Sequence, residues 1–262
     1  MQKSIIVGKN LSFIIAIAAL LAASAPVVTS TANAAFCQKM FIPAYFYPGP
    51  LWDQATAAAA TVGTMVMNPA SGPGVSSNSD YVTAVNNAQA ADIKVIGYVH
   101  TSYGSRDAAV VKAEIDSYKA WYGVSGIFLD EVASGAALIP YYQDLADYIR
   151  ATAGTFVALN PGTIPDQGYM SVGDTVVVFE GTYNTYKTWS APVWAAQYPA
   201  SKFVHLVHAT VGTTKMKNAI NWSHNRLAGN VYVTHDLLPN PWDLLPSYWS
   251  SELTQINKSC GF

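Results

Sequence analysis

Charged side chains are scarce in this sequence, and the two signs nearly balance. Of its 262 residues, 14 are Lys or Arg and 16 are Asp or Glu, so the formal net charge is −2. No basic cluster or stripe occurs, which argues against a nucleic acid partner. His-x-x-x-His spacing, cysteine clusters and a Gly-x-Ser-x-Gly segment are also absent. These absences count against a metal site and a serine-hydrolase elbow, and we expect neither a metal nor a cofactor.

In place of charge, the chain has many aromatic residues, including 16 Tyr and 7 Trp. Both residue types combine an apolar face with a hydrogen-bonding group. This combination suits the rings of a neutral sugar, although large hydrophobic cores also use aromatic residues. A polysaccharide is the partner that the composition favours.

The first 34 residues have the pattern of an export signal. Lys3 and Lys9 give a positive start, residues 11–23 form an apolar run, and Ala32-Asn33-Ala34 offers a small-x-small cleavage site. The run is too short to span a bilayer comfortably. We therefore expect a signal peptide over 1–34, secretion or a periplasmic location, and no membrane contact after cleavage.

Two cysteines, Cys37 and Cys260, lie near opposite ends of the remaining chain. In an exported protein, such a pair suggests a disulfide. A disulfide requires Cα atoms within about 7 Å, so the two ends of the mature chain would have to meet. A pair of free thiols is the alternative.

Residues 35–262 alternate short apolar runs with helical segments, without a linker, and we expect a single-domain monomer. The segment 106–122, for example, has apolar residues at helical spacing and ends at Gly123. Other helices are expected after Trp52 and over 79–91, 138–153 and 246–257, with only a short one after the fifth strand. Eight strand–helix units indicate a parallel (β/α)8 TIM barrel. The strands are expected at 39–47, 63–68, 94–100, 124–131, 155–160, 175–180, 202–208 and 229–235.

An open, doubly wound sheet is the alternative fold, but no Gly-rich dinucleotide fingerprint follows the first strand. Nearly every expected strand ends in a polar residue. Barrel enzymes have their active sites at the C-terminal ends of the strands, so these residues mark a candidate site: Tyr47, Asn68, His100, Asp130-Glu131, Asn160, Glu180, His208 and His235-Asp236.

Three acids follow apolar strands, and they are the candidate catalytic residues: Asp130, Glu131 and Glu180. Cleavage of a glycosidic bond needs one acid to protonate the leaving oxygen and one carboxylate as nucleophile or base. Nearby aromatic residues such as Tyr183 would raise the pKa of one carboxyl group by desolvation. Because strand side chains alternate, Asp130 and Glu131 start in opposite directions; one would face the barrel mouth, and the other could swing in with the loop. Helix capping or ion pairing at the rim is the alternative.

Arg106 is the cation placed to reach these acids, and it would bind a carboxylate or a sugar hydroxyl. The alternative is a solvated side chain at the start of a helix. His205 and His208 lie three apart on one expected strand, so they face opposite sides and cannot easily share a metal. His100, His208 and His235 are expected to be hydrogen-bonding wall residues.

Several motifs, taken together, resemble the spherulin-4-like (spherulation-specific family 4) proteins, which include glycoside hydrolase family 135. They are the segments 45–48, 68–74, 97–106, 126–131, 160–163 and 179–180. The resemblance implies a (β/α)8 barrel and an endo-acting hydrolase of extracellular amino-sugar polysaccharides, similar to fungal enzymes that cleave galactosaminogalactan. It also implies that the family's essential acids fall on Asp130, Glu131 and Glu180. It implies further that the cleft is lined by Tyr45, Asn68, Tyr98, Tyr103, Arg106 and Asn160, while the role of His100 stays open.

We expect Asp130 and Glu180 to be the working pair, with Glu131 in support. A separation near 5 Å would favour retention of configuration, and about 6.5–9.5 Å would favour inversion. One alternative is a non-catalytic polysaccharide-binding or cell-coat protein on the same barrel. A metal-dependent deacetylase would need a His/Asp cluster that the sequence does not supply.

Overall fold

The structure is a computed structural model that describes Met1 and residues 36–260, except for 153 and 155. The expected signal peptide, residues 1–34, lies outside the described residues apart from Met1. In the described part, no helix is long and apolar enough to cross a membrane.

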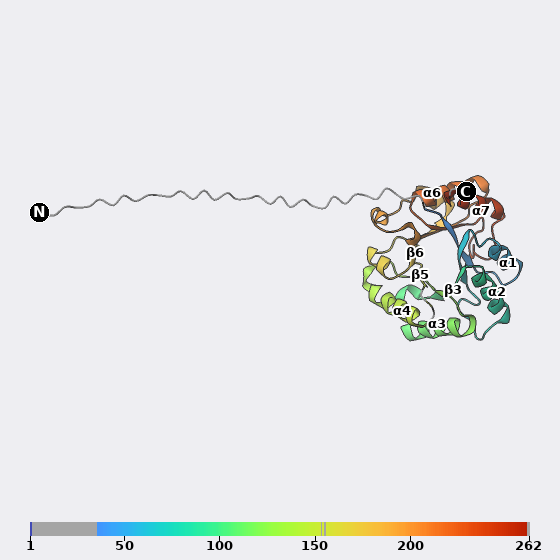
Figure 1. Cartoon of the computed structure of the whole chain (residues 1–262), viewed down its shortest axis with the longest axis horizontal. Helices are drawn as coiled ribbons and strands as arrows, with labels where there is room; N and C mark the ends of the chain where they lie inside the picture. The colour runs from blue at the N-terminus through green and yellow to red at the C-terminus, as the bar shows by residue number, and fades with distance from the viewer. Residues whose placement is uncertain (2–35, 153, 155, 261–262) are drawn as a thin grey trace. The chain divides into compact units, whose positions relative to one another are not determined.

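Eight parallel strands form a closed barrel in the order β1 to β8, which confirms the predicted (β/α)8 fold (Figure 1). Their runs of Val, Ile, Leu and Phe suit strands that are covered on both faces. The strands are β1 (Lys39–Ala44), β2 (Val62–Met67), β3 (Lys94–His100), β4 (Gly126–Asp130), β5 (Phe156–Leu159), β6 (Thr175–Thr182), β7 (Phe203–His208) and β8 (Asn230–Val233).

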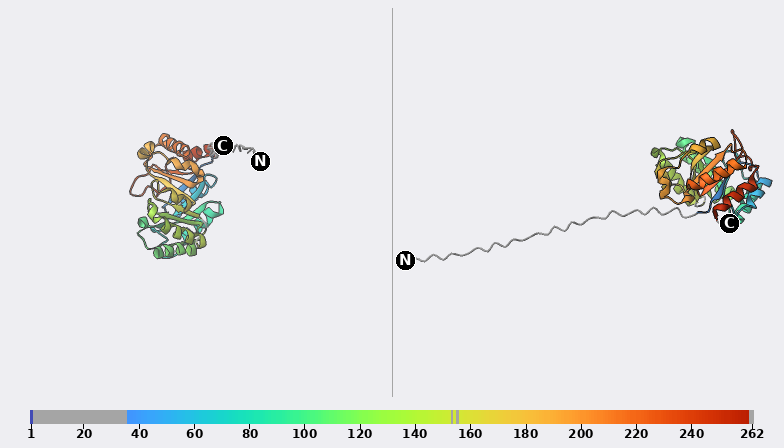
Figure 2. Two further views of the ribbon diagram at one scale, coloured as in Figure 1. Left: turned by 90° about the vertical axis from the view of Figure 1, so that its left-hand side faces the viewer. Right: turned by 90° about the horizontal axis from the view of Figure 1, so that it is seen from above.

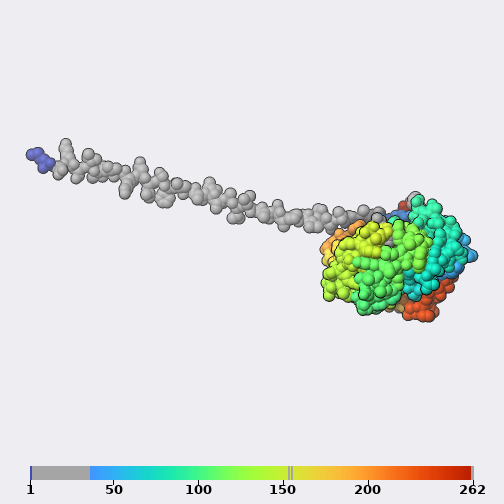
Figure 3. All heavy atoms as spheres, turned by 90° about the horizontal axis from the view of Figure 1, so that it is seen from below, coloured from blue at the N-terminus to red at the C-terminus, as the bar shows by residue number. Residues whose placement is uncertain are grey.

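Helices surround the barrel (Figure 2), and the expected elements are found close to their predicted bounds. The chain after β5 makes only a 3-10 turn, Gln167–Ser171, where a short helix was expected. The helices are α1 (Pro50–Thr56), α2 (Ser79–Ala90), α3 (Ala108–Tyr122), α4 (Ile139–Thr152), α5 (Tyr183–Thr188), α6 (Thr213–Asn225) and α7 (Trp249–Asn257). On the exterior, α3 and α4 lie side by side, with Lys112 Nζ 2.7 Å from Asp144 Oδ2 (Figure 3).

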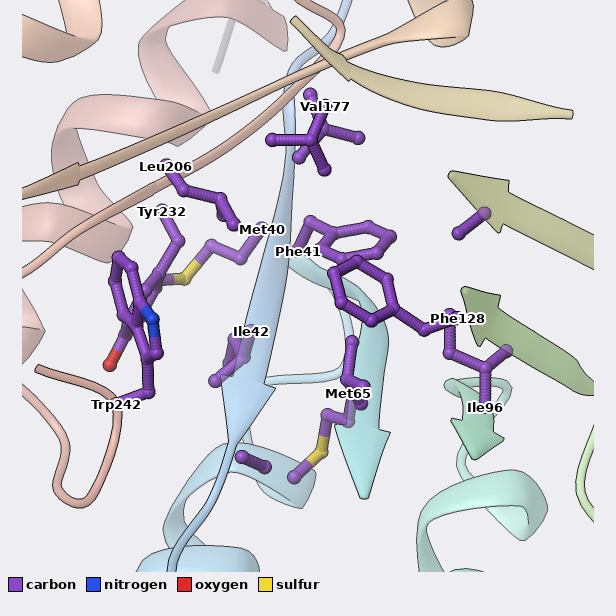
Figure 4. Packing of buried hydrophobic residues seen from close by; sticks show 14 of the residues in the cluster. Met40, Phe41, Ile42, Met65, Ile96, Phe128, Val177, Leu206, Tyr232 and Trp242 are labelled. Atoms are coloured by element: carbon purple, nitrogen blue, oxygen red, sulfur yellow. The ribbon is translucent and has the colours of Figure 1, made fainter. Parts of the chain in front are cut away.

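Large apolar side chains from successive strands fill the barrel, so it is a packed core and not a pore. The rings of Phe41 and Phe128 face one another across the interior, with centroids 5.9 Å apart (Figure 4). Met40, Met65 and Val177 pack in the same cluster, and all of these side chains are almost fully buried. The rigid interior supports the loops that follow the strands.

The barrel closes through a short contact between its first and last strands. β1 pairs with β8 only at Lys39–Asn230 and Met40–Val231. Beside this seam, Cys37 and Cys260 form the predicted disulfide, with their Cα atoms 4.4 Å apart. Residues 37 and 260, at the two ends of the barrel, therefore meet at the N-terminal side of the strands.

Candidate active site

A hollow of about 320 Å³ opens at the C-terminal ends of the strands, where the sequence places the candidate site. The three predicted acids all line it. Its lining residues are Tyr103, Asp130, Glu131, Asn160, Pro161, Gly162, Glu180 and His208.

One amide group joins the two acids that were expected to work together. Asn160 Nδ2 donates a hydrogen bond of 2.7 Å to Asp130 Oδ1 and another of 2.7 Å to Glu180 Oε2. These two oxygens are therefore at most twice that distance apart. This limit agrees with the roughly 5–5.5 Å between the carboxyl groups of retaining glycosidases and is below the inverting range.

A shift in strand register aims Glu180 into the hollow. Val177 faces the barrel interior (Figure 4), so strict alternation would turn Glu180 outward. The pairing of β6 with β7 shifts between Val177 and Phe179, and a bulge of this kind changes the direction of the following side chains. Phe179 then packs outside against Trp189, and Glu180 reaches Asn160.

A left-handed residue turns Glu131 towards the same hollow as Asp130. Glu131 has φ 52°, which breaks the strand alternation directly after β4. The Thr101 hydroxyl lies 2.9 Å from the carbonyl oxygens of both acids, and the Tyr103 N–H donates to the Glu131 carbonyl over 2.7 Å. His100 Nδ1 lies 3.6 Å from Glu131 Oε2, so His100 stands beside this third acid.

Burial separates the protonation behaviour of the two bridged acids. Desolvation, reinforced by the charge of Asp130, raises the pKa of Glu180 to about 7, although the hydrogen bonds from Asn160 and Trp242 oppose the shift. Desolvation also raises the pKa of Asp130, and hydrogen bonds from Tyr98, the Glu131 N–H and Asn160 oppose it. Below about pH 7, Glu180 therefore retains its proton beside Asp130, a carboxyl with more donors to stabilise its charge.

Aromatic residues wall the acids on the side of the first strands. Tyr45 and Tyr98 meet edge to face with ring centroids 5.5 Å apart, and the charges of Asp130 and Glu180 raise the pKa of both phenols beyond the effect of burial. Trp242, whose carbonyl accepts from the Tyr45 N–H over 3.1 Å, stands edge-on to His208, with ring centroids 6.1 Å apart. Burial lowers the pKa of His208, which keeps its ring neutral at neutral pH.

Trp242 was not among the residues predicted for the site. It lies in the loop between β8 and α7, after the polar residues His235 and Asp236 that were expected to mark the end of the eighth strand. The sequence offers only one indication of its role, namely that it is aromatic and lies in a loop at this face of the barrel.

Arg106, Asn68 and Tyr183, which were expected near the acids, have their partners outside the hollow. Both terminal guanidinium nitrogens of Arg106 pair with Glu114 of α3, and one of them also donates to the His100 carbonyl. Arg106 therefore holds its own loop in place and does not reach the site acids. Asn68 Oδ1 accepts from Gly72 N–H and closes its own loop. Tyr183 stacks on Trp222 of α6, with centroids 5.4 Å apart.

The histidines of β7 lie on opposite sides of the strand, as their spacing predicts. His208 lines the hollow, whereas His205 is buried outside the barrel with Nδ1 2.6 Å from the Tyr186 hydroxyl. Among the described residues, no three His, Cys, Asp or Glu side chains are grouped so that they could hold a metal ion.

The fold and the acids define a glycoside-hydrolase-like (β/α)8 barrel. The chain belongs to the spherulation-specific family 4, whose sequence profile matches residues 39–256. It is 37% identical over 254 residues to spherulin-4 of Physarum polycephalum, covering 91% of this chain and 76% of that protein.

The crystal structure of Aspergillus clavatus Sph3 in complex with GalNAc is similar, with a TM-score of 0.73 and 27% identity over 84% of this chain and 97% of Sph3. A cyclic α-maltosyl-(1→6)-maltose hydrolase from Arthrobacter globiformis shares the fold, with a TM-score of 0.51 and 11% identity over 84% of this chain and 77% of the hydrolase.

Proposed function

We propose that the protein is an exported, endo-acting glycoside hydrolase that cleaves an amino-sugar polysaccharide with retention of configuration. The observation that carries this proposal is the pair Asp130 and Glu180, held by one amide in a hollow at the C-terminal face of the barrel. Their separation suits a mechanism through a covalent glycosyl-enzyme intermediate.

The environments of the two acids divide their roles. Asp130, with three hydrogen-bond donors, is the carboxylate that attacks the anomeric carbon while the glycosidic C–O bond breaks. Glu180, with its pKa raised to about 7, gives its proton to the leaving oxygen. In the second step Glu180 takes a proton from water, and the water oxygen displaces Asp130 from the sugar. Glu131 supports the positive charge that develops on the sugar ring.

The substrate class comes from the site and from the relatives together. Sph3 was crystallised with GalNAc, which favours an N-acetylhexosamine unit next to the acids. Tyr103, which is 64% exposed at the rim, offers a platform for a further sugar ring. The disulfide suits an oxidising compartment, in agreement with export as a monomer that meets its polymer outside the cell.

The test is incubation of the protein with N-acetylated and de-N-acetylated hexosamine polymers, followed by mass analysis of released oligosaccharides. NMR of the first product should show the anomeric configuration of the substrate. Asp130→Asn and Glu180→Gln should abolish release, whereas Asp53→Asn, on the exposed side of α1, should not. The wild-type rate should fall as the pH rises through about 7, because Glu180 then loses its proton.

A non-catalytic polysaccharide-binding or coat protein is the competing function, and the same experiment separates the two. Polymer binding without released product, unchanged by either acid substitution, would establish the binding protein instead.

A further inference from the structure

Both polar atoms of the Asn160 side-chain amide have hydrogen-bond partners. Its two N–H groups point at Asp130 Oδ1 and Glu180 Oε2, and its oxygen accepts from the Gly162 N–H over 2.9 Å. The reverse orientation would place the amide oxygen between two carboxyl oxygens and the NH₂ group against an N–H donor. The surroundings therefore fix which end of the amide faces the acids.

The backbone around Asn160 is held as firmly as its side chain. Its N–H donates to the Leu129 carbonyl over 2.8 Å, and its carbonyl accepts from the Val132 N–H over 2.9 Å. Gly162, at φ 65°, turns the chain so that its own carbonyl accepts from the Glu180 N–H over 3.1 Å. Asn160 is only 7% exposed, so water does not compete for these bonds.

This arrangement restricts where a proton can sit on Glu180. Oε2 already accepts an N–H hydrogen, and a hydroxyl hydrogen on the same side would oppose it. Oε1 is the oxygen that Asn160 does not contact, so it is the one on which the amide leaves room for the acidic hydrogen. The amide also stands between the two acids, so the bridged oxygens cannot share one proton directly, as the closely spaced carboxyl groups of aspartic proteases do.

We propose that Asn160 is a positioning residue that keeps the acidic proton on Oε1 of Glu180 and keeps Asp130 from taking it. The inference rests on the proposed roles of Asp130 and Glu180, and it adds the residue that keeps one of them the acid and the other the nucleophile. It also revises the expectation that Asn160 belongs to the sugar-binding wall, since both of its N–H groups are engaged by the acids.

The proposal predicts a shift in both limbs of the pH–rate profile when the amide is removed. Asn160 N–H groups stabilise the ionised form of each acid, so Asn160→Leu, which keeps a similar shape, should move both limbs to higher pH. The other titratable groups that face the pair stay in place in this variant: Tyr45, Tyr98, Tyr103, Glu131 and His208.

The experiment measures kcat, KM and the pH profile of wild type, Asn160→Leu and Asn160→Ala, with Asn87→Leu on the exposed face of α2 as the matched control. We expect kcat to fall by roughly 10–100-fold, as when an orienting partner is removed, with KM changed less than about twofold. A raised KM with unchanged kcat would show that Asn160 contacts sugar and would overturn the proposal. Unshifted pH limbs would overturn it as well.

A second measurement does not depend on activity. Carboxyl ¹³C NMR should show Glu180 titrating near pH 7 in the wild type, with its signal identified by Glu180→Gln. The Asn160 side-chain NH₂ resonances should follow the same titration, and the Glu180 midpoint should rise in Asn160→Leu. If no polymer is cleaved but these shifts occur, the proposed function fails and the positioning role stands. If the Asn160 NH₂ resonances do not change as Glu180 titrates, the positioning role is overturned.

Discussion

The backbone N–H of Tyr103 donates a 2.7 Å hydrogen bond to the carbonyl of Glu131, and both residues have left-handed backbone angles, φ 55° and φ 52°. Left-handed backbone is uncommon for residues other than glycine, and it gathers at functional sites where the surroundings enforce it. Here it brings an acid and an exposed aromatic ring to one hollow from two neighbouring loops.

Glu131→Asn should separate stability from activity. Asn tolerates the left-handed conformation better than Glu does, so the melting temperature should stay the same or rise, while polymer cleavage falls because the carboxylate is lost. The control is Glu131→Val, whose branched side chain should cost roughly 1 kcal/mol or more in the same conformation. Equal destabilisation in both variants, measured by thermal unfolding, would show that the backbone at this position does not determine stability.

Glu180→Gln should flatten the pH dependence of stability. In the folded protein the pKa of Glu180 is raised from 4.5 to about 7, so between these values the native state binds a proton that the unfolded chain has lost. Stability from this group is therefore full below about pH 4.5 and decreases as the pH rises to about 7, by about 1.4 kcal/mol per unit of pKa shift and on the order of 3 kcal/mol in total.

Urea unfolding of wild type and Glu180→Gln at several pH values measures this difference, with Asp53→Asn as the exposed-acid control. The variant should gain on the wild type as the pH rises from 4.5 to 7. A constant difference across that window would contradict the raised pKa.

Glu252→Gln should be tolerated where Glu252→Ala is not. Glu252 is fully buried between α7 and β8, its Oε1 accepts from the Val233 N–H over 3.0 Å, and burial raises its pKa well above the usual value. The amide keeps the acceptor for Val233 without a charge, and its advantage over Glu should grow with rising pH. Alanine leaves a buried N–H unpaired and a cavity, which together cost roughly 2–5 kcal/mol. Denaturant unfolding at neutral and alkaline pH distinguishes these outcomes.

Removing the disulfide should weaken the fold while leaving the chemistry intact. The bridge joins residues 223 positions apart, and replacing both Cys37 and Cys260 with Ser should cost roughly 2–5 kcal/mol. The cysteines lie at the opposite end of the strands from the acids, so kcat of the folded double variant should equal that of the wild type. A lower kcat at a temperature where the variant is fully folded would mean that the disulfide affects the geometry of the acids.

The fold was predictable because buried parallel strands are short apolar runs, and because their polar ends mark one face. Helix α6 was not predicted, because polar and charged residues predominate in its segment. Its buried residues do have helical spacing: Met216, Ala219, Ile220 and Ser223. The predicted acids line one hollow, whereas the features that aim them were not predictable. A register shift inside the uninterrupted apolar run of β6 leaves no mark in the sequence.

The positive φ of Glu131 has no local sequence signal either, since its cause is the Thr101 hydroxyl and the Tyr103 amide from the preceding loop. Arg106 was a reasonable candidate partner for the site acids, but Glu114 on the following helix binds it first. Trp242 reaches Glu180 from a loop more than 60 positions away in sequence, a contact that only the closed barrel creates.

The disulfide seam has a practical consequence for attachment. Cys37 and Cys260 bring the two ends of the barrel itself to one pole, and the acids occupy the other pole. A barrel tethered beside Cys37 or Cys260, to a bead, a carrier domain or a cell wall, would therefore present its acids away from the support, towards the polymer in solution.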